Sequence, residues 1–276
     1  MTRPRGVTLV ECLAAIVVSG VLMAAAYALL LTGSRLARAE SSLLDVRRNV
    51  RAAAGVLRAE LQGVSADAGD LLAISDSAVT LRAQRGFGVV CAPPGVSSIV
   101  LDDSLLSLRR TIDPTKDVAL VYADGDPMTS VDDRWLPATV TWVRRGACTN
   151  GAPGTMLSLG GATIAADLAD VGSGAPVRLY EVLEYRRYRD AAGLWWLGVR
   201  GPASGGGWTA SSPIAGPLAP RGGLVFRFTD TLGIATATPN EVAMVEVAVH
   251  VVAARAHAPG LVRQDSLVAR IAVRGP

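Results

Sequence analysis

The chain is poor in the residues from which catalytic and metal centres are usually built. Its 276 residues include two histidines, His250 and His257, and a single lysine, Lys116. No Gly-x-Ser-x-Gly, Cys-x-x-Cys, His-Glu-x-x-His or phosphate-loop pattern occurs. We therefore expect a protein that is not an enzyme and that has no catalytic residues and no cofactor. His250 falls opposite the valines of its strand-like segment, where we expect it to be exposed.

A strong charge of either sign is also absent. Lysine and arginine number 27 against 24 acidic residues, a formal net charge of +3, and the arginines are scattered along the chain. A basic stripe or patch is typical of a nucleic-acid-binding surface, so we expect no nucleic-acid partner. Half of the residues are hydrophobic, and the length allows one anchor and one soluble domain of roughly 200 residues.

Proline is absent from residues 6–92, which leaves a long segment free of helix breakers. Apolar residues recur within 43–61 at spacings typical of one face of an α-helix. The spacing predicts one helix from about Val7 to about Gln62, on the order of 80 Å long at the standard rise. We expect its second half, 32–64, to be amphipathic and to pack against a sheet.

Charged residues are absent from a run of twenty residues, 12–31, near the N-terminus. Such a run spans the roughly 30 Å hydrocarbon core of a bilayer at about 1.5 Å per residue. Arg3 and Arg5 precede it, so the positive-inside rule places everything after Leu31 outside the cytoplasm. Glu11 stands at the edge of the run, where a carboxylate is costly in lipid and by default marks a function.

Two interpretations of this segment give Glu11 no role. A secretory signal peptide would have a shorter apolar core and an Ala-x-Ala-like exit, whereas Thr32-Gly33-Ser34 follows this run. A plain signal anchor accounts for the length and for the flanking charges. The plain anchor would carry an extracytoplasmic binding or enzymatic domain, and this is the alternative function.

The third interpretation is a resemblance to a known family. The sequence Gly6-Val7-Thr8-Leu9-Val10-Glu11 resembles the class III leader of type IV pilins and type II secretion pseudopilins. The resemblance implies that prepilin peptidase cuts between Gly6 and Val7 and methylates the new amino group of Val7. It also implies that Glu11 serves assembly by meeting the positive amino terminus of a neighbouring subunit. Val7 is one departure, because the family usually has phenylalanine there.

From about residue 78 onward the sequence pattern is typical of β-strands. Short runs of β-branched and aromatic residues lie between turn residues, which predicts about ten strands. We expect hairpins from 177–189 with 194–199 and from 98–101 with 105–110. A stretch rich in Gly, Pro and Ser, 201–223, predicts a long loop.

The predicted fold is α+β, a long N-terminal helix packed on a mostly antiparallel β-sheet domain. We expect a leader peptide, a transmembrane part of the helix, its amphipathic extension and an extracytoplasmic β-rich domain, at residues 1–6, 7–31, 32–64 and 65–276. This layout resembles the larger minor subunits of the family, the J-type pseudopilin of type II secretion and the W-type minor pilin of type IV pili.

Three cysteines occur, and two of them can form a disulfide. Cys12 lies in the membrane run and is interpreted as a small apolar filler. Cys91 and Cys148 end strand-like segments outside the cytoplasm, where two lone cysteines often pair. A bridge that closes about 57 residues would contribute roughly 4 kcal/mol on the chain-entropy model. Two buried free thiols are the alternative.

One acidic cluster has the composition of a cation site. Asp124 and Asp126 are followed by Asp132, and calcium takes about six to eight oxygen ligands. Met128 stands where an EF-hand loop would need its third ligand. We interpret the cluster as an acidic turn without metal, with Asp124, Asp126 and Asp132 as weak candidates.

These features predict a minor pilin or pseudopilin, a structural subunit of a type II secretion pseudopilus or a type IV pilus. The implied partners are prepilin peptidase, other pilins or pseudopilins, the inner-membrane assembly platform and, before assembly, membrane lipid. The expected location is the inner membrane, crossed once with the soluble domain outside the cytoplasm, and then the filament. Processing separates this interpretation from a plain anchor, which keeps its leader.

Overall fold

The computed structural model describes residues 8–126, 128–161, 167–253 and 264–274. Within these ranges the chain forms one long helix, α1 (Leu9–Leu61), and a single sheet of thirteen strands. The strands are β1 (Leu71–Ile74), β2 (Ala78–Val89), β3 (Ser98–Asp102), β4 (Ser107–Leu108), β5 (Asp117–Ala123), β6 (Arg134–Ala147), β7 (Pro153–Gly160), β8 (Pro176–Arg189), β9 (Trp195–Arg200), β10 (Ser212–Leu218), β11 (Leu224–Thr229), β12 (Met244–Val252) and β13 (Gln264–Ala272). Two 3-10 turns, Leu168–Asp170 and Pro239–Glu241, complete the described elements.

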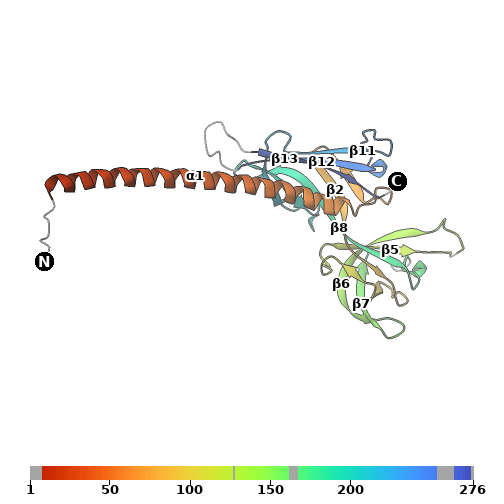
Figure 1. Ribbon diagram of the computed structural model, residues 1–276. Helices are drawn as coiled ribbons and strands as arrows, with labels where there is room; N and C mark the ends of the chain where they lie inside the picture. Colours follow the sequence, from red (N-terminus) through yellow and green to blue (C-terminus); the bar gives the residue numbers. More distant parts are fainter. Residues whose placement is uncertain (1–7, 127, 162–166, 254–263, 275–276) are drawn as a thin grey trace, which may run out of the picture.

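The helix α1 is continuous over 53 residues because no proline interrupts it. Its first half extends away from the rest of the molecule, and its second half lies along the sheet (Figure 1). Residues 9–33 are exposed, and regular burial begins at Val46. The amide of Asn49 donates a 2.9 Å hydrogen bond to the backbone oxygen of Gly216, which fixes the helix where it reaches the sheet.

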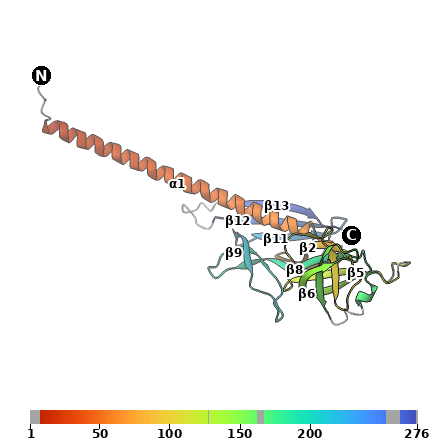
Figure 2. The same cartoon turned by 90° about the horizontal axis from the view of Figure 1, so that it is seen from below.

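Two long strands form the spine of the sheet. β2 pairs with β8 along nearly its whole length, from Ala78 opposite Arg186 to Val89 opposite Pro176. The other edge of β8 is shared, because its first half pairs with β5 and its second half with β9. The sheet therefore divides into a proximal lobe, formed by β1 and β9–β13 beside α1, and a distal lobe, formed by β3–β7 (Figures 1 and 2).

Each lobe has its own hydrophobic core. In the proximal core, the buried face of α1, including Leu57 and Leu61, packs against strand residues such as Leu81 and Val247. The distal core contains Ile99 and other fully buried side chains from β3, β7 and β8. Every strand pair in the sheet is antiparallel. The predicted α+β fold, a long helix on a mostly antiparallel sheet, is confirmed.

The predicted hairpin of 98–101 with 105–110 is wrong. β3 pairs with β7, and the two residues of β4 pair with β2 instead. β4 can lie there because Gly86 has no side chain, since a Cβ atom at Gly86 would lie 2.5 Å from Leu108 Cδ2. The turn chemistry was visible in the sequence, but the partners of the two strands depend on residues far away along the chain.

The predicted loop 201–223 is also wrong in its second half, which contains β10. Pro213, Gly216 and Pro217 made this segment resemble a loop. The strand tolerates these residues because its pairing with β9 is irregular, with register shifts on either side of Ala215. The predicted hairpin of 177–189 with 194–199 is confirmed as β8 and β9, and His250 is exposed as predicted.

Candidate functional site

The N-terminal end of α1 is built as a capping box. Thr8 is the N-cap, and its side-chain oxygen accepts a hydrogen bond from the backbone N–H of Glu11 at 3.3 Å. In return the Oε2 atom of Glu11 accepts from the backbone N–H of Thr8 at 2.9 Å and from its hydroxyl at 3.0 Å. The carboxylate therefore closes the first turn of its own helix.

The sequence interpretation missed this role of Thr8. Thr8 and Glu11 form a Thr-x-x-Glu pattern directly before an apolar run, which is the sequence signature of a capping box. The cleavage residues Gly6 and Val7 lie outside the described residues. The helix begins at Leu9 in the structure, two residues after the residue that the sequence interpretation chose.

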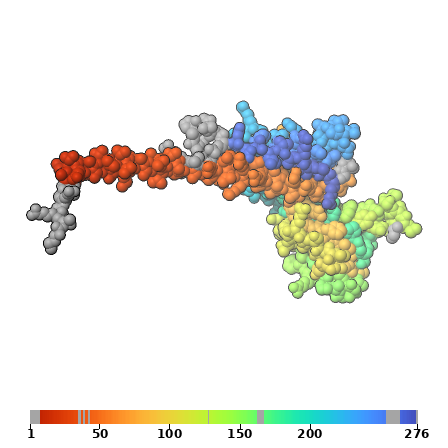
Figure 3. All heavy atoms as spheres, in the orientation of Figure 1, coloured from red at the N-terminus to blue at the C-terminus, as the bar shows by residue number. Residues whose placement is uncertain are grey.

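The segment Leu9–Ser34 is long and apolar enough to cross a membrane, with a mean hydropathy of 2.4 in its most apolar window. None of that window is covered by the rest of the protein, and the space-filling view shows the same bare helix (Figure 3). The hydroxyls of Thr32 and Ser34 bond back to carbonyl oxygens of Ala28 and Leu31, at 2.8 and 2.9 Å. Such internal bonds are what an apolar solvent requires of polar groups.

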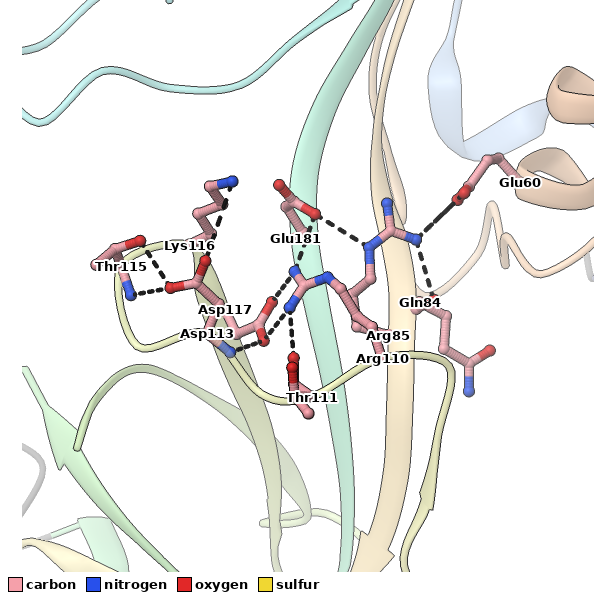
Figure 4. Close-up of polar contacts among 10 residues, drawn as sticks. All are labelled: Glu60, Gln84, Arg85, Arg110, Thr111, Asp113, Thr115, Lys116, Asp117 and Glu181. Carbon is pink, nitrogen blue, oxygen red and sulfur yellow. Dashed lines mark hydrogen bonds and ion pairs between the residues drawn. The ribbon is translucent and has the colours of Figure 1, made fainter. Parts of the chain in front are cut away.

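At the other end of α1, ion pairs join the helix to the spine strands β2 and β8 and to the distal lobe (Figure 4). Arg85 binds Glu60 in the last turn of α1 at 3.2 Å and Glu181 in β8 at 3.0 Å. Arg110 also binds Glu181 at 3.0 Å. Both of its terminal nitrogens donate hydrogen bonds to the carboxylate of Asp117 at the start of β5. We call these five residues the junction network.

Most side chains of the junction network are buried or nearly so. The side chain of Asp117 is fully buried, and those of Arg85, Glu60 and Glu181 are 11%, 16% and 15% exposed. Burial alone would lower the pKa of Arg85, but the charges of Glu60 and Glu181 outweigh it and raise that pKa. A β-bulge positions Arg85, because Gln84 and Gly86 pair with adjacent residues of β8 and leave Arg85 without a partner in the ladder.

A cavity of about 410 Å³ opens beside this network, in the gap that β5 and β9 leave along β8. The charged side chains that line it are Lys116, Asp117, Glu181 and Arg200. Each of them has an ion-pair partner: Asp113, Arg110, Arg85 and Glu184, respectively. Among the residues described, the cavity therefore presents no unpaired charge that could act as a general acid or base.

The two cysteines of the β-rich part are joined by a disulfide, Cys91–Cys148, with Cα atoms 5.0 Å apart. The bridge connects the end of β2 with the turn between β6 and β7, so it cross-links the distal lobe to the end of the spine strand β2. Cys12 is a free, exposed cysteine within the apolar half of α1.

The weak metal candidates lie on the loops between β5 and β6. Asp124 has a raised pKa because of burial and because the carboxylates of Asp133 and Asp132 lie nearby. A hydrogen bond to Asp133, together with burial, raises the pKa of Tyr122 to about 12. No group of three or more His, Cys, Asp or Glu side chains in the described part of the chain is arranged to hold a metal ion.

Comparison with known proteins adds one finding, and it falls on the segment whose geometry is given above. Residues 1–27 match the family described as the prokaryotic N-terminal methylation motif. No curated protein and no solved structure matches the chain. The match covers the capping box and most of the uncovered apolar helix. The chain thus carries a prepilin-type N-terminal motif, which supports a type IV pilin-like or pseudopilin precursor.

Proposed function

We propose that the protein is a structural subunit of a type II secretion pseudopilus or a type IV pilus. One observation carries the proposal: the methylation motif at residues 1–27 coincides with the start of a helix whose residues 9–33 have no covering partner. A long bare apolar helix suits a lipid bilayer before assembly and the packed interior of a filament afterwards. We infer no enzymatic activity, since the mechanism needs only processing and packing.

Within this class the layout favours one of the larger minor subunits, of the J type in type II secretion or of the W type in type IV pili. The helix is followed by thirteen strands in two lobes. The distal lobe stands beyond the end of α1 and is stapled by its own disulfide. In an assembled filament it would project away from the helical interior and remain free to contact other proteins.

The N-terminal methylation motif suggests the following sequence of events. Prepilin peptidase removes residues 1–6 on the cytoplasmic side and methylates Val7. Removal of Arg3 and Arg5 lowers the formal net charge from 27 − 24 = +3 to 25 − 24 = +1. The carboxylate of Glu11 then meets the new amino group of a neighbouring subunit, and this ion pair in an apolar setting aligns the two helices. The inner-membrane assembly platform would receive the subunit in this state.

Mass spectrometry of the protein purified from its own membranes tests the proposal. We expect an N-terminus at Val7 carrying a methyl group. Gly6→Leu should block cleavage, whereas Gly6→Ala should be partly tolerated, because the peptidase must accommodate a tight backbone at this position. Gly33→Leu is the matched control, because a side chain at Gly33 meets nothing within 4 Å. It should be cleaved normally.

The alternative is a plain signal anchor with an extracytoplasmic binding or enzymatic domain. It predicts that the leader is retained, so that Met1 or Thr2 stays at the N-terminus in membranes. It also predicts that Gly6→Leu and Gly33→Leu behave alike. Either result would overturn the filament proposal.

A further inference from the structure

Three arginines lie along one side of the docked half of α1. Arg47, Arg51 and Arg58 are separated by four and seven residues, spacings that place side chains on the same side of a helix. All three are exposed, although the opposite face of the same turns is buried in the proximal core. We call these three residues the arginine stripe. It extends over about 17 Å at the standard rise of an α-helix.

The arginine stripe is not neutralised by ion pairs within the described part of its own chain. None of its members has an ion pair in the described residues, whereas Arg48, on a neighbouring side of the helix, lies 3.7 Å from Asp45. The segments outside the described residues contain no aspartate or glutamate. Arg47 and Arg51 are like charges four residues apart, an arrangement that destabilises a helix by about 0.2–0.5 kcal/mol. The Arg47–Arg51 pair is thus slightly unfavourable in the monomer.

Lipid headgroups are too far away to supply this counter-charge. The apolar segment ends at Ser34, so Arg47 lies about 20 Å beyond it and Arg58 about 36 Å beyond it along the helix. The headgroup layer adds only about 5–8 Å on each side of the hydrocarbon core. Screening at physiological salt limits charge attraction to about 8 Å. A counter-charge fixed on another molecule would therefore have to come from a protein surface that approaches α1 outside the membrane.

We propose that the arginine stripe docks an acidic surface of a different filament subunit. The inference rests on the proposed function and adds the chemistry of the partner. Close approach to the stripe is possible at Gly55, which lies exposed between Arg51 and Arg58 and has no side chain. Because α1 is one continuous rod, a subunit that packs against its bare first half in the filament also comes within reach of the stripe. Carboxylates on that subunit would then fix its register along the helix.

Site-specific photo-crosslinking in native membranes tests this contact. Benzoylphenylalanine is introduced at Gly55, between Arg51 and Arg58, where an added side chain meets nothing within 4 Å. The full-length protein should crosslink to a second protein that carries the N-terminal methylation motif, at a peptide rich in Asp or Glu. The reversals Arg51→Glu and Arg58→Glu together should reduce the crosslinked fraction about tenfold, because like charges would then face each other. Raising the salt concentration should reduce it as well.

Arg221→Glu is the matched control, since Arg221 is an exposed arginine in the turn between β10 and β11. It should leave the crosslink unchanged. If the double reversal leaves the crosslinked fraction unchanged, the proposal is overturned. A crosslink only to a second copy of this chain, or only to lipid, also overturns it. Failure of the proposed function has a different signature, because the leader would then remain uncut. Normal processing with a charge-independent crosslink therefore rejects the acidic partner alone.

Discussion

Arg85 in β2 holds Glu60 in the last turn of α1, with 3.2 Å between the guanidinium and the carboxylate. The same guanidinium reaches Glu181 in β8, from which Arg110 continues the chain of contacts to Asp117 in the distal lobe. The end of the long helix and the start of the distal lobe are thus joined by charges that are mostly shielded from water. The junction network sets how the distal lobe sits on the helix that a filament would hold.

Arg85→Met should therefore destabilise the protein strongly. Methionine keeps much of the length of the side chain but leaves Glu60 without its ion-pair partner in a mostly buried position. Breaking a buried ion pair by removing one partner costs about 3–5 kcal/mol, and we expect a loss near the lower end because the carboxylates keep some contact with water. Denaturant unfolding of the detergent-solubilised protein measures the loss.

The double variant Arg85→Met with Glu60→Gln should recover part of this loss, because no uncompensated carboxylate remains at the helix end. Arg221→Met is the control at an exposed arginine and should change stability by less than about 0.5 kcal/mol. Equal stabilities of Arg85→Met and Arg221→Met would show that the junction network contributes nothing to folding.

The Cys91–Cys148 bridge gives a second prediction. Cys148→Ser should abolish the mobility difference between reduced and non-reduced protein on electrophoresis and should destabilise the distal lobe. The expected loss is about 2–5 kcal/mol, because the open chain regains the entropy that the closed loop had lost. Cys12→Ser, which removes the free cysteine, should leave both properties unchanged. Two freely alkylated thiols at Cys91 and Cys148 in the wild type would contradict the bridge.

The ion pairs of Glu246 lead to a prediction of how the folding stability of the protein depends on pH. Hydrogen bonds from Arg270 and Arg227, both at 2.9 Å, lower the pKa of this carboxyl group below its ordinary value of 4.5. Below pH 4.5 the unfolded chain binds a proton at this position before the folded chain does. The contribution of Glu246 is therefore present above that pH and is lost as the pH falls through the folded value.

Arg270→Gln should remove most of this dependence. The stability difference between wild type and Arg270→Gln, measured by denaturant unfolding, should be larger at pH 7 than at pH 3. Arg221→Gln serves as the control for loss of an exposed arginine, and its difference from wild type should be the same at both pH values. A difference for Arg270→Gln that does not shrink in acid would contradict the assignment.

The parts of this molecule that sequence reasoning predicted are those that depend on local pattern. The helical period of α1, the apolar run and the turn between the two strands of the hairpin 177–189 with 194–199 each depend on neighbouring residues. Gly193 in that turn has a positive φ of 83°. The pairing of β3 with β7 was not predictable in this way, because it joins residues more than fifty positions apart. Sequence alternation gave no sign of the bulge at Arg85, so the junction network stayed hidden. Thr8, in contrast, could have been found from the Thr-x-x-Glu pattern.

The last prediction separates the two roles that Glu11 can have. In the monomer its Oε2 atom caps the helix through Thr8, at 2.9 and 3.0 Å. In the proposed filament its negative charge pairs with the amino group of a neighbour. Glutamine at the third position of a helix also closes a capping box, so Glu11→Gln keeps the cap and removes the charge. Thr8→Ala does the reverse, at a cost of about 1 kcal/mol to the helix end.

Membrane fractionation measures the insertion of these variants, and co-purification with the other filament subunits measures their recruitment. Glu11→Gln and Glu11→Ala should both insert as well as the wild type, or slightly better, since a charge leaves the edge of the bilayer. Both should lose most of their recruitment to partner subunits, whereas Thr8→Ala should keep most of it. If Thr8→Ala fails as badly as Glu11→Gln, assembly needs the helix cap as well as the charge. If Glu11→Gln assembles normally, the charge has no part in assembly, and the plain anchor becomes the better account of this segment.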